Sequence, residues 1–202
     1  TIGINISDQF ALADGLSKTE HRLLSAALDQ YAERIQSAEA LAIGWLETRS
    51  VSEQALYPSI VAQAQSFIER AFSSEAITLG TTTTDDLAWW LREAVEDMDL
   101  EVWFHPSVSR QFRDHQAHSK PFDGPRPSNN LIRLGDLLHV DFGITYLRLN
   151  TDTQQHAYIL KDGESELPRA LKAAFKQGND LQDILMSQFI AGRTGNNILL
   201  SS

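Results

Sequence analysis

Cysteine is absent from the 202-residue sequence, so the protein can form neither disulfide bonds nor thiolate metal sites. This absence does not identify the compartment, because reducing and oxidising locations both tolerate cysteine-free proteins. Long apolar runs are missing too, and nothing at the start of the chain reads as a signal peptide. The first residue is Thr1 rather than methionine, which favours a processed or excised chain that has lost any targeting segment. We expect a soluble protein of the cytoplasm or periplasm with no membrane partner.

Basic residues are scarce. Lysine and arginine total 17 against 27 aspartates and glutamates, which gives a formal net charge of -10, and the basic residues are scattered. A surface that binds a nucleic-acid backbone needs clustered positive charge. We therefore exclude nucleic acid as a partner and expect a cation or a neutral substrate. The length and the 42% hydrophobic content allow a domain with a substantial core.

Helical patterns dominate the first half of the chain. After a short strand predicted at Ile2–Ser7, apolar residues spaced by three and four predict one long amphipathic helix from Lys18 to Trp45. This pattern favours a helix packed on a core over a coiled-coil dimer. A second helix is predicted from about Ser52, with Pro58 near its beginning, where proline is tolerated best.

A third helix is predicted after Gly80. Thr83 and Asp86 have the spacing of a capping box, which satisfies the free N–H groups at a helix start. Trp89 and Trp90 are adjacent and cannot both point inward, so one of them should cover a neighbouring element or a cleft wall. Strand character follows at 101–104 and 107–110.

A long loop is predicted from Gln111 to about Arg133. Such loops are usually functional or mobile. His115 and His118 lie in it and His105 precedes it, and each is a candidate functional residue.

The segment 139–158, HVDFGITYLRLNTDTQQHAY, is rich in strand-forming residues but carries Asp141 and Asp152. Two β-prone runs, 137–146 and 150–160, predict an antiparallel hairpin. A turn at 147–149 would set Asp141 opposite Asp152, on a face shared with His139, Thr145, Gln154 and His156.

Directly opposed residues on neighbouring strands have β-carbons about 5 Å apart, so two opposed carboxylates repel and such a hairpin needs a counter-charge. A polar face that merely meets water remains the alternative interpretation. No lysine or arginine shares this face, and this absence favours a bound cation over a face that is merely exposed to water. Oxygen ligands without thiolates suit Mn²⁺, Mg²⁺, Co²⁺ or Zn²⁺, and two carboxylates also suit a two-metal hydrolase.

The motif Gly135-Asp-Leu-Leu-His-Val-Asp-Phe-Gly143, followed by Tyr146 and Asp152, resembles the metal hairpin of the pita-bread metallopeptidases. This superfamily contains Xaa-Pro aminopeptidases, prolidases, methionine aminopeptidases and creatinase. Residues 77–87 and 192–196 also resemble helix starts of that fold, and the Xaa-Pro aminopeptidase branch is the most similar in character. The resemblance implies an α/β (α+β) protein with a partial pita-bread fold, in which long helices pack on an antiparallel sheet. Residues 1–13 would be the last strand and linker of a smaller N-terminal domain, and 14–202 the N-terminal part of a catalytic domain whose C-terminal half is absent.

The resemblance also implies an activity. The parent would be a metal-dependent aminopeptidase that acts on short peptides with proline second, using two divalent ions: Mn first, with Co or Zn as alternatives. Asp141 and Asp152 would be the first two of five metal ligands. The other three, a histidine and two glutamates, would lie beyond this chain, so the chain alone would be inactive. At most one of His105, His115 and His118 would bind the substrate carbonyl.

Some positions depart from the family pattern. Gln154 and Gln155 stand where many relatives have threonine and arginine. Such departures also suit a pita-bread module that has lost its metals and binds peptides or proteins, or a creatinase-like C–N hydrolase. An intact histidine and glutamate pair downstream would favour the enzyme, and a homodimer is compatible with either.

Overall fold

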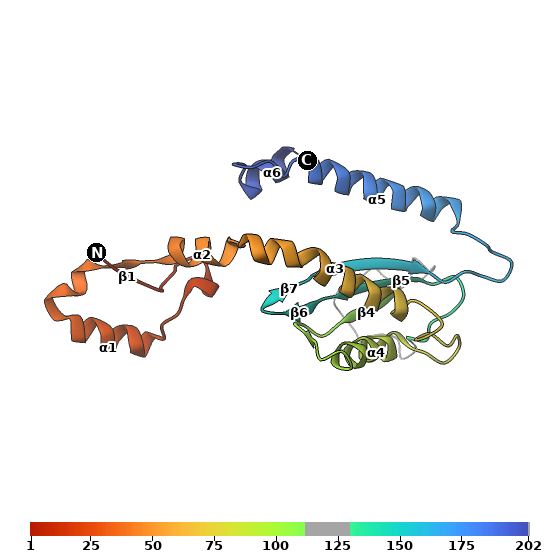
Figure 1. The fold of residues 1–202 in the computed structure, drawn as a ribbon, viewed down its shortest axis with the longest axis horizontal. Coiled ribbons are helices and arrows are strands. Elements are labelled where there is room, and N and C mark those ends of the chain that lie inside the picture. Colours follow the sequence, from red (N-terminus) through yellow and green to blue (C-terminus); the bar gives the residue numbers. More distant parts are fainter. Residues whose placement is uncertain (112–129, 202) are drawn as a thin grey trace, which may run out of the picture. The chain divides into compact units, whose positions relative to one another are not determined.

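The computed structural model describes residues 1–111 and 130–201. The chain divides into two units, Thr1–Tyr57 and Pro58–Ser202 (Figure 1). This division does not test the domain boundary expected between residues 13 and 14, which stays a prediction. Within the described residues, no helix combines the length and apolarity needed to cross a membrane.

The first unit pairs two short strands in parallel, and helical segments connect them. Strand β1 (Ile2–Ile4) confirms the strand predicted at the start of the chain, and it pairs with β2 (Ile35–Ser37). The helices are α1 (Lys18–Leu28) and α2 (Glu39–Glu47), with 3-10 segments at Ala11–Ala13 and Asp29–Arg34.

The single long helix predicted from Lys18 to Trp45 is wrong. Helix α1 ends at Leu28, because the following residue, Asp29, has a φ of 47°, outside the helical range. The chain then forms β2, and the main-chain N–H of Ala38 donates to the carbonyl of Ile4 at 2.8 Å. Pairing with β1 therefore overrides a periodic pattern that considers only nearby residues.

Helix α3 (Val51–Ala71) confirms the second predicted helix, but Pro58 lies well inside it rather than at its beginning. Proline has no N–H to donate, so the helix lacks one internal hydrogen bond at the point where the two units divide. Most of the predicted apolar face is buried, although Val61 remains 38% exposed. The buried positions are Ile60, Ala64, Phe67, Ile68 and Ala71.

The second unit is built on short antiparallel sheets. One has the order β4-β5-β8 and the other β3-β6-β7, and the helices accompany them, so the predicted mixed fold class is confirmed. The strands are β3 (Glu101–Val102), β4 (Ser107–Gln111), β5 (Leu137–Phe142), β6 (Ile144–Tyr146), β7 (Leu149–Asn150) and β8 (Thr153–Tyr158). The helices are α4 (Thr84–Glu96), α5 (Arg169–Ser187) and α6 (Gly195–Ser201).

The core of this unit lies on one face of β5. Burial alternates along the strand as predicted, with Leu138, Val140 and Phe142 buried and the intervening residues partly exposed. Phe67 of α3 packs edge-on against Phe142, with 6.1 Å between the ring centroids. Helix α4 packs against β3 and β4. The opposite face of β5 carries His139 and Asp141, whose side chains are outside this core and only partly buried.

The start of α4 confirms the predicted capping box. The Thr83 hydroxyl accepts from the Asp86 N–H at 3.1 Å, and the Asp86 carboxylate accepts from the Thr83 N–H at 2.9 Å. The expectation that only one tryptophan could turn inward is also met. Trp89 is 57% exposed, whereas Trp90 is half-buried and has the Arg70 guanidinium 5.2 Å from its ring.

Candidate metal centre

The hairpin turn fixes which residues face each other. Leu147 and Arg148 both have positive φ, 49° and 67°, as a two-residue I′ turn requires. Leu149 is therefore the first residue of β7 and pairs with Tyr146, rather than belonging to the predicted three-residue turn. Counted outward from this turn, Asp141 comes opposite Gln154, whereas the predicted three-residue turn would have placed it opposite Gln155.

Asp141 faces Gln154 of β8, not Asp152, so the predicted direct pairing of the aspartates is wrong by two residues. Asp152 lies just before β8, in the diagonal position, and its charge still reaches Asp141. Burial, followed by the neighbouring charge of Asp152, raises the pKa of Asp141 above its ordinary value, and His139 opposes this effect. The hairpin thus brings the two carboxylates together on one face.

The Asp141 carboxylate has an unsatisfied oxygen. Its Oδ1 is buried and has no hydrogen-bond partner within the described residues. A buried polar atom without a partner costs free energy, and for an ionised carboxylate the cost is larger. A cation, or a hydrogen-bond donor outside the described part of the chain, would remove this cost by binding the oxygen.

Because Gly143 has no β-carbon, the Trp103 indole and the Thr151 carbonyl can approach the backbone between the two aspartates closely. Trp103 donates from Nε1 to the Thr151 carbonyl at 2.5 Å, directly beside Gly143. A β-carbon at residue 143 would collide with both the Thr151 carbonyl and the Trp103 indole. The Thr151 hydroxyl also accepts from the Ile144 N–H at 3.0 Å, so the segments that carry Asp141 and Asp152 are linked.

Sequence reasoning missed these supporting residues. A glycine inside a β-prone run signals a close approach of another group, and Gly143 gave that signal. The identity of the approaching group could not be read, because Trp103 lies 40 positions earlier in the chain.

The neighbours of Asp141 on this face are polar. Ser107 of β4 faces Asp141 on the other side of β5. His139 Nε2 lies 3.0 Å from the Gln154 side-chain oxygen, and its ring centroid lies 4.8 Å from that of His156. The face therefore carries side-chain oxygen and nitrogen atoms, and those of His139 and Gln154 contact each other.

The candidate carbonyl-binding histidines are not brought to the carboxylates in the described structure. His105 packs edge-on against Trp89, with 5.5 Å between the ring centroids. His115 and His118 lie outside the described residues. Across 1–111 and 130–201, no cluster of three or more metal-binding side chains forms.

Comparison with solved structures identifies the fold. The X-Pro aminopeptidase of Thermotoga maritima matches with a TM-score of 0.64 and 20% identity, over 91% of this chain and 48% of the aminopeptidase. The prolidase of Thermococcus sibiricus matches with a TM-score of 0.54 and 18% identity, over 88% of this chain and 44% of the prolidase. The chain shares the pita-bread fold.

A dipeptidase from Pyrococcus horikoshii also matches, with a TM-score of 0.50 and 16% identity, over 90% of this chain and 53% of the dipeptidase. The chain thus spans about half the length of the pita-bread structures it resembles. No family model matches the sequence, and no curated protein matches it. At these identities, the comparison establishes the fold, and the chemistry must be argued from the residues.

The two aspartates fit a divalent cation. They supply hard oxygen ligands, and the unpartnered Oδ1 of Asp141 is an acceptor that a cation would satisfy. Two carboxylates are fewer ligands than such an ion usually takes from a protein. The described residues therefore supply two candidate ligands and no complete metal site.

Proposed function

We propose that this chain is part of a metal-dependent aminopeptidase of the Xaa-Pro aminopeptidase kind, which removes the N-terminal residue of short peptides. The observation that carries the proposal is the buried, unpartnered Oδ1 of Asp141 next to Asp152. The pita-bread fold, shared with an X-Pro aminopeptidase, a prolidase and a dipeptidase, supports the same activity.

Asp141 and Asp152 would hold two divalent cations, with manganese as the first candidate. Such a metal pair supplies an activated water and a Lewis acid at neutral pH. The protein itself would place the two negatively charged carboxylates next to each other and fix their positions. Trp103, Gly143 and Thr151 do so by locking the backbone that bears the carboxylates.

The remaining ligands, a histidine and two glutamates, would come from sequence beyond this chain. In that arrangement, residues 14–202 are the first part of the catalytic domain, and residues 1–13 end a smaller preceding domain. One of His105, His115 and His118 would contact the substrate carbonyl in the complete site.

Manganese binding tests the ligand assignment without relying on activity. Free Mn²⁺ gives a strong electron paramagnetic resonance signal that diminishes on binding, so the 202-residue chain can be titrated directly. We expect Asp141→Asn and Asp152→Asn each to weaken binding, because each removes a charged ligand. Asp183→Asn on the exposed part of α5 is the matched control and should bind as the parent does. Equal binding by all four proteins would refute the assignment.

A peptide-binding module without catalysis is the second candidate. The observation that favours it is an open groove beside β8, which needs no metal to accept a ligand. Peptide hydrolysis by the full-length parent, lost in Asp141→Asn, would decide for the enzyme.

A further inference from the structure

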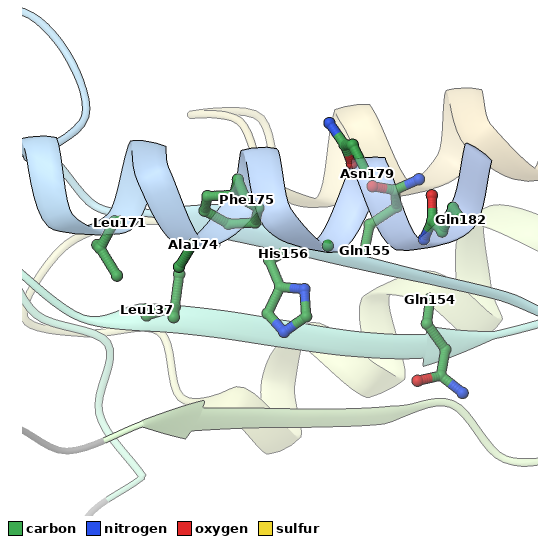
Figure 2. Close-up of a pocket in the computed structure, with 10 residues that line it drawn as sticks. Leu137, Gln154, Gln155, His156, Leu171, Ala174, Phe175, Asn179 and Gln182 are labelled. Carbon is green, nitrogen blue, oxygen red and sulfur yellow. The ribbon is translucent and has the colours of Figure 1, made fainter. Parts of the chain in front are cut away.

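A groove of about 390 Å³ opens between β8 and α5 in the second unit (Figure 2). Its volume is within the range of small-ligand sites. The groove lies beside the candidate metal centre and is distinct from it, because neither aspartate lines it. The two sites are connected through Gln154, which lines the groove and faces Asp141 across the strands.

Carboxamides dominate the polar lining. A carboxamide has two N–H donors and a carbonyl acceptor. Two of these groups already have partners in the protein: the Gln154 side-chain oxygen lies 3.0 Å from His139 Nε2, and Gln155 Nε2 donates to the Gln65 side-chain oxygen at 3.3 Å. None of the described lining residues is charged, although the chain has a formal net charge of -10. A groove of this kind complements an uncharged ligand that both donates and accepts hydrogen bonds. The carboxamides belong to Gln154, Gln155, Asn179 and Gln182.

The rest of the lining is apolar or aromatic. Phe175 of α5 packs edge-on against His156, with 5.7 Å between the ring centroids, and the two rings form one side of the groove. Burial, followed by the proximity of His139, lowers the pKa of His156, so the ring is neutral at pH 7. Leu137 and Leu171 add aliphatic surface, as Figure 2 shows. Small apolar side chains would fit against this wall.

Strand β8 adds main-chain groups. In the described sheet it pairs with β5 alone, so it is an edge strand. An edge strand presents unpaired N–H and C=O groups, and extended peptides bind to such edges by adding a strand. Helix α5 runs along β8 in Figure 2, so a peptide there would contact both elements.

We propose that this groove binds an uncharged, extended stretch of peptide, held by its amide groups between β8 and the carboxamides of α5. The choice of a peptide as the ligand rests on the proposed function, whereas the neutrality and amide character of the ligand follow from the lining. The groove would hold the part of a peptide that extends away from the metal centre. It thereby selects uncharged side chains at those positions.

A blocked peptide tests this proposal. Acetyl-tetraalanine amide has no charge, and acetyl-tetraglutamate amide is its charged counterpart. In ¹H–¹⁵N spectra of the 202-residue chain, we expect the neutral peptide to shift the side-chain NH₂ signals of Asn179 and Gln182. The charged peptide should leave these signals in place. Shifts confined to residues outside the groove, or equal shifts with both peptides, would overturn the proposal.

A pair of tryptophan variants makes the test site-specific. Gly178 lines the groove, and a β-carbon at this position would meet no other atom within 4 Å, so Gly178→Trp should fill the groove without disturbing the fold. Gln177 precedes it on α5, is exposed and does not line the groove, so Gln177→Trp is the matched control. We expect Gly178→Trp to weaken peptide binding by about tenfold or more, as loss of a central contact does, and Gln177→Trp to leave it unchanged. Equal affinities for the two variants would contradict the proposed site.

The two proposals fail separately. Asp141→Asn should lose manganese affinity and keep peptide binding, because Asp141 does not line the groove. Manganese binding that is unaffected by Asp141→Asn, with peptide binding intact, would refute only the metal assignment. Normal manganese binding without any response to the neutral peptide would refute only the groove.

Discussion

At the residue scale, Asp141 combines two unfavourable features. Its Oδ1 is buried and has no hydrogen-bond partner within residues 1–111 and 130–201. Burial, followed by the charge of the nearby Asp152 carboxylate, raises the pKa of Asp141. A structural role would be better served by asparagine or serine, which carry no charge. The presence of two charges is therefore the strongest local argument that this hairpin holds a cation.

Asp141→Asn should not destabilise the metal-free chain. Removing one of two close like charges relieves a repulsion of at most about 1 kcal/mol, the upper end of the range for directly opposed residues, so the variant should melt at the same temperature or slightly higher. In excess Mn²⁺ the order should reverse, because only the parent gains binding energy in its folded state. Thermal melting with and without the metal checks this result, with Asp183→Asn as the control. An equal metal-induced rise in all three proteins would show that Asp141 is not a ligand.

Gly143 admits a second test at this scale. Alanine there would collide with the Thr151 carbonyl and the Trp103 indole, and overpacking of this kind typically costs about 1 to 3 kcal/mol. Gly178→Ala is the matched control, since that helical position is open and alanine should stabilise it by about 0.5 to 1 kcal/mol. Urea unfolding of both variants gives the comparison. A Gly143→Ala protein as stable as the parent would mean that the Trp103 contact does not hold the hairpin.

At the element scale, features that depend on residues close in sequence were predicted correctly, and features that depend on residues far apart in sequence were not. The capping box at Thr83 and the alternation along β5 depend on residues a few positions apart, and the structure confirms both. The helix predicted from Lys18 to Trp45 is wrong because β2 pairs with β1, some 33 residues away, as Ile35 opposite Ile2 shows. The pairing of Asp141 with Asp152 does not follow from a turn at 147–149, which would place Asp141 opposite Gln155. The observed two-residue turn has no glycine or asparagine to signal it, because Leu147 and Arg148 adopt the positive φ values, and it places Asp141 opposite Gln154.

The start of α4 should make stability depend on pH. Hydrogen bonds from Thr83, first from its backbone, lower the pKa of Asp86, so the ionised form is preferred in the folded state. The contribution is fully present above the ordinary carboxyl pKa of about 4 and is lost as pH falls through the lower folded value. Asp86→Asn should therefore lower the melting temperature at pH 7 and narrow its difference from the parent as the pH approaches 3. Asp85→Asn, on the same turn but outside the capping box, controls for the loss of charge. A difference that is constant with pH would exclude the carboxylate as the source.

At the scale of the whole molecule, the fold was predictable from one motif, and the position of His105 relative to the aspartates was not. The GDLLHVDFG motif carried the resemblance, and structures with the pita-bread fold match over about nine-tenths of the chain. The described residues bring together Asp141 and Asp152, whereas His105 lies against Trp89. Side-chain placement of that kind depends on packing between elements, which spacing along the sequence does not reveal.

The 202-residue chain alone should have negligible peptidase activity, even with added Mn²⁺. Two aspartates leave a divalent ion short of protein ligands, and across the described residues no third ligand joins them. The neutral peptide should still bind in the groove, because all of its described lining residues belong to one unit of the chain. Incubation of the purified chain with a Xaa-Pro peptide and Mn²⁺, followed by chromatography of the products, measures the activity, with an active Xaa-Pro aminopeptidase as the positive control. Turnover by the chain that disappears in Asp141→Asn would show that the residues present suffice for catalysis, and the need for ligands from outside the chain would then be wrong.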